Sequence, residues 1–108
     1  MKIETAPNGR LTLRLTGEID HHSAAAMRKT ADAALIRFRP RELVLDFSDV
    51  SFMDSSGVGF VMGRSKHAAA FDCKTAVCGL KERDRRIMKL SGLESLVTFC
   101  TDERKETT

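Results

Sequence analysis

Hydrophobic and polar residues alternate strictly over residues 10–16, and this period of two predicts a half-buried strand. The turn-forming sequence Pro-Asn-Gly at 7–9 separates it from a short segment at 2–5, so the two segments together predict a hairpin with an edge strand. A nearly continuous apolar run at 43–47 is typical of a central strand covered on both faces. Two further short strands are expected at 74–78 and 96–99.

Three other segments carry apolar residues at helical spacing. The first begins near residue 22 or 23, where Asp20 or Ser23 can cap it, and it ends before Pro40. The second extends from 55 or 56 to 70, and the third covers 81–90, with Gly92 directly after its end. The residues expected to face inward are Met27, Ala31, Ala34, Leu35 and Phe38, then Val58, Val61, Met62, Ser65 and Ala69, and then Ile87 and Leu90.

The order of these elements is ββ-α-β-α-β-α-β. Strands that alternate with helices need crossover connections. We therefore expect an α/β sandwich with a mostly parallel mixed sheet, an antiparallel edge and helices packed on it. Residues 48–54 are expected to form a loop, and 101–108 a short charged tail or a stunted last helix. A chain of 108 residues corresponds to one domain, 1–108.

The composition is that of a globular domain, with 42% hydrophobic and 31% charged residues. No apolar run approaches the roughly 20 residues that a membrane helix needs. The first residues, Met-Lys-Ile-Glu-Thr, lack the apolar stretch of a signal peptide. We therefore expect a cytoplasmic protein without membrane contact.

Cysteines and basic residues limit the candidate chemistry. Cys73, Cys78 and Cys100 are odd in number and lack the ligand spacing of a zinc site, so in a cytoplasmic chain we expect reduced thiols. The net charge is only +3, and the sequence has no Trp or Tyr to stack on bases. Acids interrupt the densest basic stretch, 81–86, which is typical of a solvated helix face. Direct binding of nucleic acid is therefore not expected.

The segment 51–59, Ser-Phe-Met-Asp-Ser-Ser-Gly-Val-Gly, carries the strongest functional signal. It follows a predicted parallel strand, where such sheets place functional loops, and two serines stand at the start of the next helix. Asp54 can cap that helix, which leaves a serine hydroxyl free. Gly57 and Gly59 leave the backbone of the first turn uncovered, and Gly59 with Gly63 would let the helix pack closely on the sheet.

A phosphate on the free serine would lie near unpaired N–H groups and the positive end of the helix dipole, while the Asp54 carboxylate would oppose it. These effects are of similar size, about 0.3–1 kcal/mol. We therefore expect phosphorylation to leave the fold intact and to act at a partner interface instead.

Known catalytic and metal-binding patterns are absent from the sequence. Residues 51–59 match neither the nucleophile motif G-x-S-x-G nor a nucleotide-binding glycine loop. In the segment 17–23, His21 and His22 stand beside Asp20, but adjacent residues point in different directions and do not favour a shared metal. A capped helix start with exposed imidazoles accounts for them. No catalytic residue, cofactor or metal is expected.

Four segments together resemble the STAS-domain family: Gly-Glu-Ile-Asp-His-His at 17–22, Leu-Val-Leu-Asp-Phe at 43–47, Val-Ser-Phe-Met-Asp-Ser-Ser-Gly-Val-Gly at 50–59 and Met-Lys-Leu-Ser-Gly-Leu at 88–93. The similarity extends to about Phe99. The first and third segments resemble in particular the branch of the family that antagonises anti-sigma factors. The resemblance implies the STAS fold and a regulator that is not an enzyme.

The resemblance also implies a phosphorylation switch. The unphosphorylated protein would bind an anti-sigma factor that is also a serine kinase, and it would thereby release a sporulation sigma factor. The kinase would phosphorylate the first serine after the aspartate, Ser55, and a serine phosphatase would restore the active form. The residues expected to bind the kinase are Asp20, His21, Ser23, Met53, Asp54, Ser56 and Gly57.

Two other functions are consistent with the same residues. One is a STAS partner-switching regulator of a different, stress-response sigma pathway. The other is an enzyme or small-molecule-binding domain that uses Asp20, His21 and His22. The family usually has a longer final helix than 101–108 allows, and the free protein is expected to be a monomer.

Overall fold

The computed structural model describes residues 1–100, so the tail or stunted helix predicted at 101–108 lies outside the described residues. One five-stranded sheet forms the centre of the domain. The elements in chain order are β1 (Lys2–Thr5), β2 (Arg10–Ile19), α1 (His21–Phe38), β3 (Glu42–Met53), α2 (Ser55–Ala69), β4 (Lys74–Cys78), α3 (Glu82–Leu90), the short 3-10 helix η1 (Leu93–Ser95) and β5 (Thr98–Phe99).

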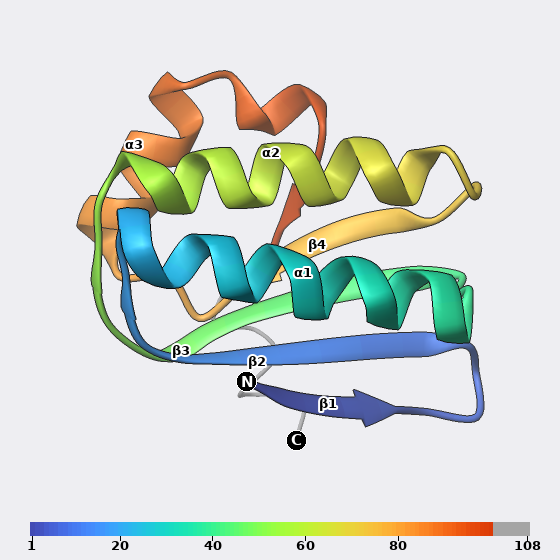
Figure 1. Ribbon diagram of the computed structural model, residues 1–108. Helices are drawn as coiled ribbons and strands as arrows, with labels where there is room; N and C mark the ends of the chain where they lie inside the picture. Colours follow the sequence, from blue (N-terminus) through green and yellow to red (C-terminus); the bar gives the residue numbers. More distant parts are fainter. Residues whose placement is uncertain (101–108) are drawn as a thin grey trace.

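The sheet has the predicted mixed topology, with the strand order β1-β2-β3-β4-β5. β1 pairs with β2 in an antiparallel edge hairpin, and all other neighbouring strands are parallel. Helices α1 and α2 lie side by side over one face of the sheet, and α3 lies near the end at which α1 and α2 begin (Figure 1). Within residues 1–100, no helix combines the length and the apolar character that a membrane crossing requires.

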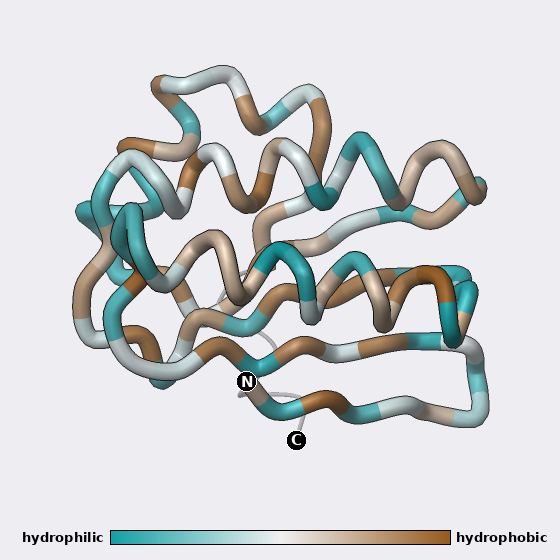
Figure 2. The backbone as a smooth tube through the Cα atoms, viewed as in Figure 1, coloured by the Kyte–Doolittle hydropathy of each residue, from teal (hydrophilic) through white to brown (hydrophobic). Residues whose placement is uncertain are grey.

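The main core lies between the sheet and helices α1 and α2. Strict alternation along β2 sends Leu11, Leu13 and Leu15 into this core. Hydrophobic positions accordingly recur along β2 and β3 in Figure 2. Residues 43–47 of β3 are buried without interruption, which confirms the prediction of a central strand covered on both faces.

Asp46 is the one charged residue in this buried run of β3. Burial opposes its negative charge, but the hydroxyl and backbone N–H of Ser48 both donate hydrogen bonds to it, at 2.7 and 2.9 Å. Together with Arg14, whose Nε lies 3.4 Å from the carboxylate, these bonds hold the pKa of Asp46 below its ordinary value. The carboxylate is therefore satisfied within the sheet.

The parallel pairing of β2 and β3 extends further than predicted, and the prediction of a loop at 48–54 is wrong. β3 continues to Met53 and β2 to Ile19. Two register shifts interrupt the pairing, and Gly17 there has the left-handed φ of 79°. Such irregularities break the period of two, so the sequence of β3 after Phe47 does not resemble a strand.

The buried helix faces agree with the prediction in part. Ala31, Ala34 and Leu35 of α1 are buried as expected, as are Val58, Val61 and Ser65 of α2. Phe38, Ala69 and Leu90 are exposed instead, and Leu90 retains 82% of its accessible surface. Residues outside the predicted faces are buried in their place: Ala24, Phe60, Arg64, Ala68 and Met88.

Glycines in the first turns of α2 differ in what surrounds them. Gly57 is buried, and a Cβ there would overlap the side chain of Met53, which is itself buried. Gly59 and Gly63 have open space where a Cβ would stand. The close packing expected of Gly59 and Gly63 is therefore wrong, and it is Gly57 that permits close approach between α2 and the end of β3.

The prediction of three reduced thiols is also wrong, because Cys78 and Cys100 form a disulfide. The N–H of Cys100 donates to the carbonyl of Val77 at 2.8 Å, which holds the chain after β5 beside the end of β4. The two Cα atoms are consequently 4.8 Å apart, within the range that a disulfide spans. Their separation of 22 residues conceals this proximity in the sequence. Cys73 is a buried free cysteine, as predicted.

We expect Gly57→Ala to lower the free energy of unfolding by about 1–3 kcal/mol, because the added methyl group displaces Met53 from a filled core. Gly59→Ala is the matched control in the same helix, and it should be neutral or stabilising by up to about 1 kcal/mol. Urea denaturation followed by circular dichroism measures both variants. Equal stabilities of the two variants would contradict the packing role of Gly57.

Candidate functional site

Two helix starts meet at one end of the sheet. Ile19 and Met53 are paired at the ends of the parallel strands β2 and β3, and the N–H of Asp54 donates to the carbonyl of Ile19 at 3.2 Å. Each strand continues directly into a helix, β2 into α1 and β3 into α2 (Figure 1). The two predicted segments, 17–23 and 51–59, therefore form one surface, which we call the switch end of the sheet.

Of the two predicted caps of α1, Asp20 and Ser23, the structure has Asp20 at the N-cap position. Its carboxylate accepts hydrogen bonds from the N–H groups of His22 and Ser23, at 3.0 and 2.9 Å. The Ser23 hydroxyl accepts from the N–H of Asp20 and donates to the carbonyl of Glu18, which completes a capping box. The bond from the Ser23 backbone contributes most to lowering the pKa of Asp20, so the carboxylate is charged at neutral pH.

Asp54 caps α2 and so leaves the following serines free of that role. Its carboxylate accepts from the N–H of Ser56 at 2.7 Å, and its carbonyl accepts from the N–H of Gly57 at 3.0 Å. Ser55 is exposed at the first position of the helix, and within residues 1–100 no side-chain hydrogen bond engages its hydroxyl. Ser56 is half-buried. Of the two serines that Asp54 frees from capping, Ser55 is therefore the more exposed.

The predicted partner-binding residues fall into two groups. Asp20, His21, Ser23, Asp54 and Ser56 lie on the surface or partly exposed, around the two helix starts. Met53 and Gly57 are buried and pack against each other, so they support the surface from below and present almost nothing to a partner. The uncovered backbone expected at Gly57 is therefore absent, while Gly59 is exposed as expected.

Phe52 is the residue at this end whose exposure the sequence reasoning missed. It retains 46% of its accessible surface, whereas its neighbour Met53 retains 1%. Sequence alone marks both as bulky apolar residues, and the irregular end of β3 decides which of the two points inward. Ser51 and Phe52 are both exposed and Met53 is buried, so this part of β3 does not alternate between buried and exposed residues.

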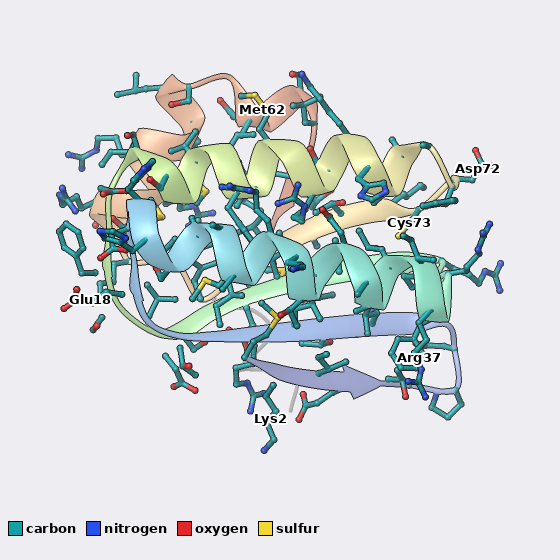
Figure 3. All side chains as sticks on the ribbon, in the orientation of Figure 1. Lys2, Glu18, Arg37, Met62, Asp72 and Cys73 are labelled. Carbon is teal, nitrogen blue, oxygen red and sulfur yellow. A yellow bond between two sulfur atoms is a disulfide. The ribbon has the colours of Figure 1, made fainter. Side chains whose placement is uncertain are left out.

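Carboxylates gather at the switch end. Glu18 projects from it (Figure 3) and is the register partner of Phe52, while Asp20 and Asp54 cap the two helices. Lys81, directly before α3, donates to the carbonyl of Ser51 at 3.3 Å and brings a positive charge to the border of the surface. An added phosphate at Ser55 would therefore join an already acidic group of side chains, at the positive end of the α2 dipole.

The histidines of this surface have the exposed character that the sequence predicts. His21 and His22 are both exposed, with ring centroids 6.0 Å apart, and the Asp20 carboxylate beside them is occupied by backbone N–H groups. Among residues 1–100, His, Cys, Asp and Glu side chains form no group of three that could hold a metal ion.

Comparison with known proteins agrees with this architecture. The STAS domain model matches residues 2–106. An anti-sigma F factor antagonist of Paenibacillus polymyxa is 35% identical over 95 residues, which are 88% of this chain and 81% of that protein. An anti-sigma-B factor antagonist of Listeria monocytogenes is 24% identical over 97 residues, 90% of this chain and 84% of that protein.

Solved structures of the anti-sigma factor antagonist SpoIIAA share the fold. Its unphosphorylated form is 30% identical with a TM-score of 0.78, over 96% of this chain and 90% of that one. The phosphorylated form of the Bacillus protein is 29% identical with a TM-score of 0.73, over 98% of this chain and 96% of that one. The chain belongs to the STAS domain family and, within it, to the anti-sigma factor antagonists.

Proposed function

We propose that this protein is a switch that binds an anti-sigma factor with serine kinase activity through the switch end, and that phosphorylation of Ser55 ends the binding. The observation that carries the proposal is that Asp54 and Ser55 have different roles at the start of α2. Asp54 caps α2, and the Ser55 hydroxyl stays exposed and available to a kinase. The similarity to an antagonist solved in phosphorylated and unphosphorylated forms supports the same proposal.

The chemical step needs a nucleophile from this chain and a nucleotide from the partner. The Ser55 oxygen attacks the γ-phosphorus of ATP held by the kinase, the bond to ADP breaks, and the hydroxyl proton passes to a base of the kinase. The product carries about −1.5 to −2 additional charge at neutral pH. This chain is the substrate of the reaction and supplies no cofactor.

The added charge acts on the interface more than on the fold. The positive end of the α2 dipole favours a phosphate by about 0.3–1 kcal/mol, and the nearby Asp54 opposes it by a similar amount. A partner surface that fits the neutral serine, however, must desolvate the added charge, which costs several kcal/mol when an ion is buried. The complex is therefore lost while the structure of this protein persists.

The proposed partners follow from the pathway of the more similar relatives. The kinase is the anti-sigma F factor, and its capture releases the sporulation sigma factor. A serine phosphatase removes phosphate from Ser55 and returns the protein to its binding form. Asp20, His21, Ser23, Asp54 and Ser56 surround Ser55 in this interface. The protein acts as a single domain, monomeric when free, in the cytoplasm.

Incubation with the kinase and ATP should add one phosphate to the parent protein at Ser55, because this hydroxyl is exposed and unengaged. Mass spectrometry of the intact protein and its peptides measures the site. Ser55→Ala should accept no phosphate, and Ser95→Ala, which removes an exposed serine outside the switch end, should accept it normally. Phosphate on Ser55→Ala at the rate of the parent would contradict the assignment.

A charge at position 55 should weaken kinase binding more than a change of size does. We expect Ser55→Glu to lower the affinity by about tenfold or more, and the neutral Ser55→Gln, of the same length, to lower it several-fold less. Isothermal titration calorimetry with the kinase measures both. Equal losses would show that shape rather than charge controls the interface.

The alternative is that this protein acts in a sigma B pathway, because it is also similar to an anti-sigma-B factor antagonist of Listeria. Binding of the parent protein should be strongest with anti-sigma F kinases in a panel that also contains anti-sigma B kinases, since the relatives of the sigma F pathway are more similar. Preference for an anti-sigma B kinase would assign the protein to the stress-response pathway and leave the role of Ser55 intact.

A further inference from the structure

Phe52 is the most exposed phenylalanine of the protein. The sequence has six phenylalanines and no Trp or Tyr, and all six lie in the described part of the chain. Phe47 and Phe60 are buried, and Phe71 and Phe99 are partly so. Phe38 is 41% exposed at the end of α1, whereas Phe52 is 46% exposed at the end of β3. Met53 is thus buried in the interior, and the side chain of Phe52 beside it is exposed to solvent.

The location of Phe52 links it to the proposed phosphorylation site. Two residues, Met53 and Asp54, lie between it and Ser55, so the two Cα atoms are at most about 11 Å apart. Because Met53 is buried under Gly57 and Asp54 is held by the carbonyl of Ile19, the chain between Phe52 and Ser55 is fixed to the sheet. Aromatic side chains, including phenylalanine, are enriched at the cores of protein interfaces.

We propose that Phe52 is the apolar anchor of the kinase interface and that its burial makes this interface intolerant of phosphate at Ser55. This inference rests on the proposed function. It assigns to Phe52 the contact with the kinase that the sequence had suggested for Met53. When Phe52 enters a pocket of the partner, water leaves the surroundings of Ser55. Charge on Ser55 is then desolvated, and its cost rises as the local dielectric constant falls.

The surroundings of Phe52 also define the chemistry of the complementary pocket. Glu18 is its register partner, and the carboxylates of Asp20 and Asp54 cap the adjacent helices. An apolar pocket bordered by basic side chains fits this arrangement, whereas an acidic border would repel it. The kinase is therefore expected to present such a pocket, and added salt should slow association with this protein.

Phe38→Ala is a matched control for Phe52→Ala. The two phenylalanines have similar exposure, but α1 begins at the switch end and Phe38 is its last residue, so the length of an 18-residue helix separates Phe38 from the site. We expect Phe52→Ala to weaken binding of the kinase selected from the panel by about tenfold or more, and Phe38→Ala to change it less than about twofold. Circular dichroism and thermal unfolding verify that both variants fold.

Coupling between Phe52 and Ser55 is the decisive measurement. In a double-mutant cycle measured by calorimetry, Ser55→Glu should reduce affinity by a clearly smaller factor in the Phe52→Ala background than in the parent, because the charge is then less desolvated. Parent-like binding of folded Phe52→Ala, or equal factors in the two backgrounds, would overturn the inference while the switch at Ser55 stands. Failure of the parent itself to bind any kinase of the panel would instead contradict the proposed function.

Discussion

The pairing of Ile19 with Met53 at the ends of β2 and β3 is the constraint on which the functional surface depends. It brings together two chain segments that lie more than thirty residues apart in the sequence. The hydrogen bond from the N–H of Asp54 to the Ile19 carbonyl fixes the position of one segment along the other. Both helices start within two residues of this pair, so their capping aspartates become neighbours at one edge. Without that register, Asp20 and Ser55 would belong to separate surfaces.

Capping by aspartate gives this surface its chemical asymmetry. A serine at the start of a helix ordinarily uses its hydroxyl to satisfy the first N–H groups. At both helix starts here a carboxylate has taken that role, and in α1 the serine three positions later reinforces the cap. In α2 the corresponding position is Gly57, which serves packing against Met53. Ser55 is consequently not needed as a cap, and it is the more exposed of the two serines at this helix start.

Local patterns in the sequence predict most of the fold, and long-range geometry accounts for the errors. Alternation at 10–16, the apolar run at 43–47 and the caps at Asp20 and Asp54 are local features, and the structure contains them. The continuation of β3 to Met53 depends on pairing with β2 through register shifts, which no local pattern reveals. The Cys78–Cys100 disulfide and the exposure of Phe52 instead of Met53 likewise depend on neighbours distant in sequence.

The cap at Asp54 has a consequence for how long such a protein retains a signal. In the proposed switch, a phosphate on Ser55 would replace none of the bonds that hold α2, so the state of the molecule would be recorded in one covalent ester and not in a strained conformation that relaxes. Phosphate monoesters hydrolyse extremely slowly in water without an enzyme. Such a record would survive thermal fluctuation of the protein, and the enzyme that hydrolyses the ester would set its lifetime.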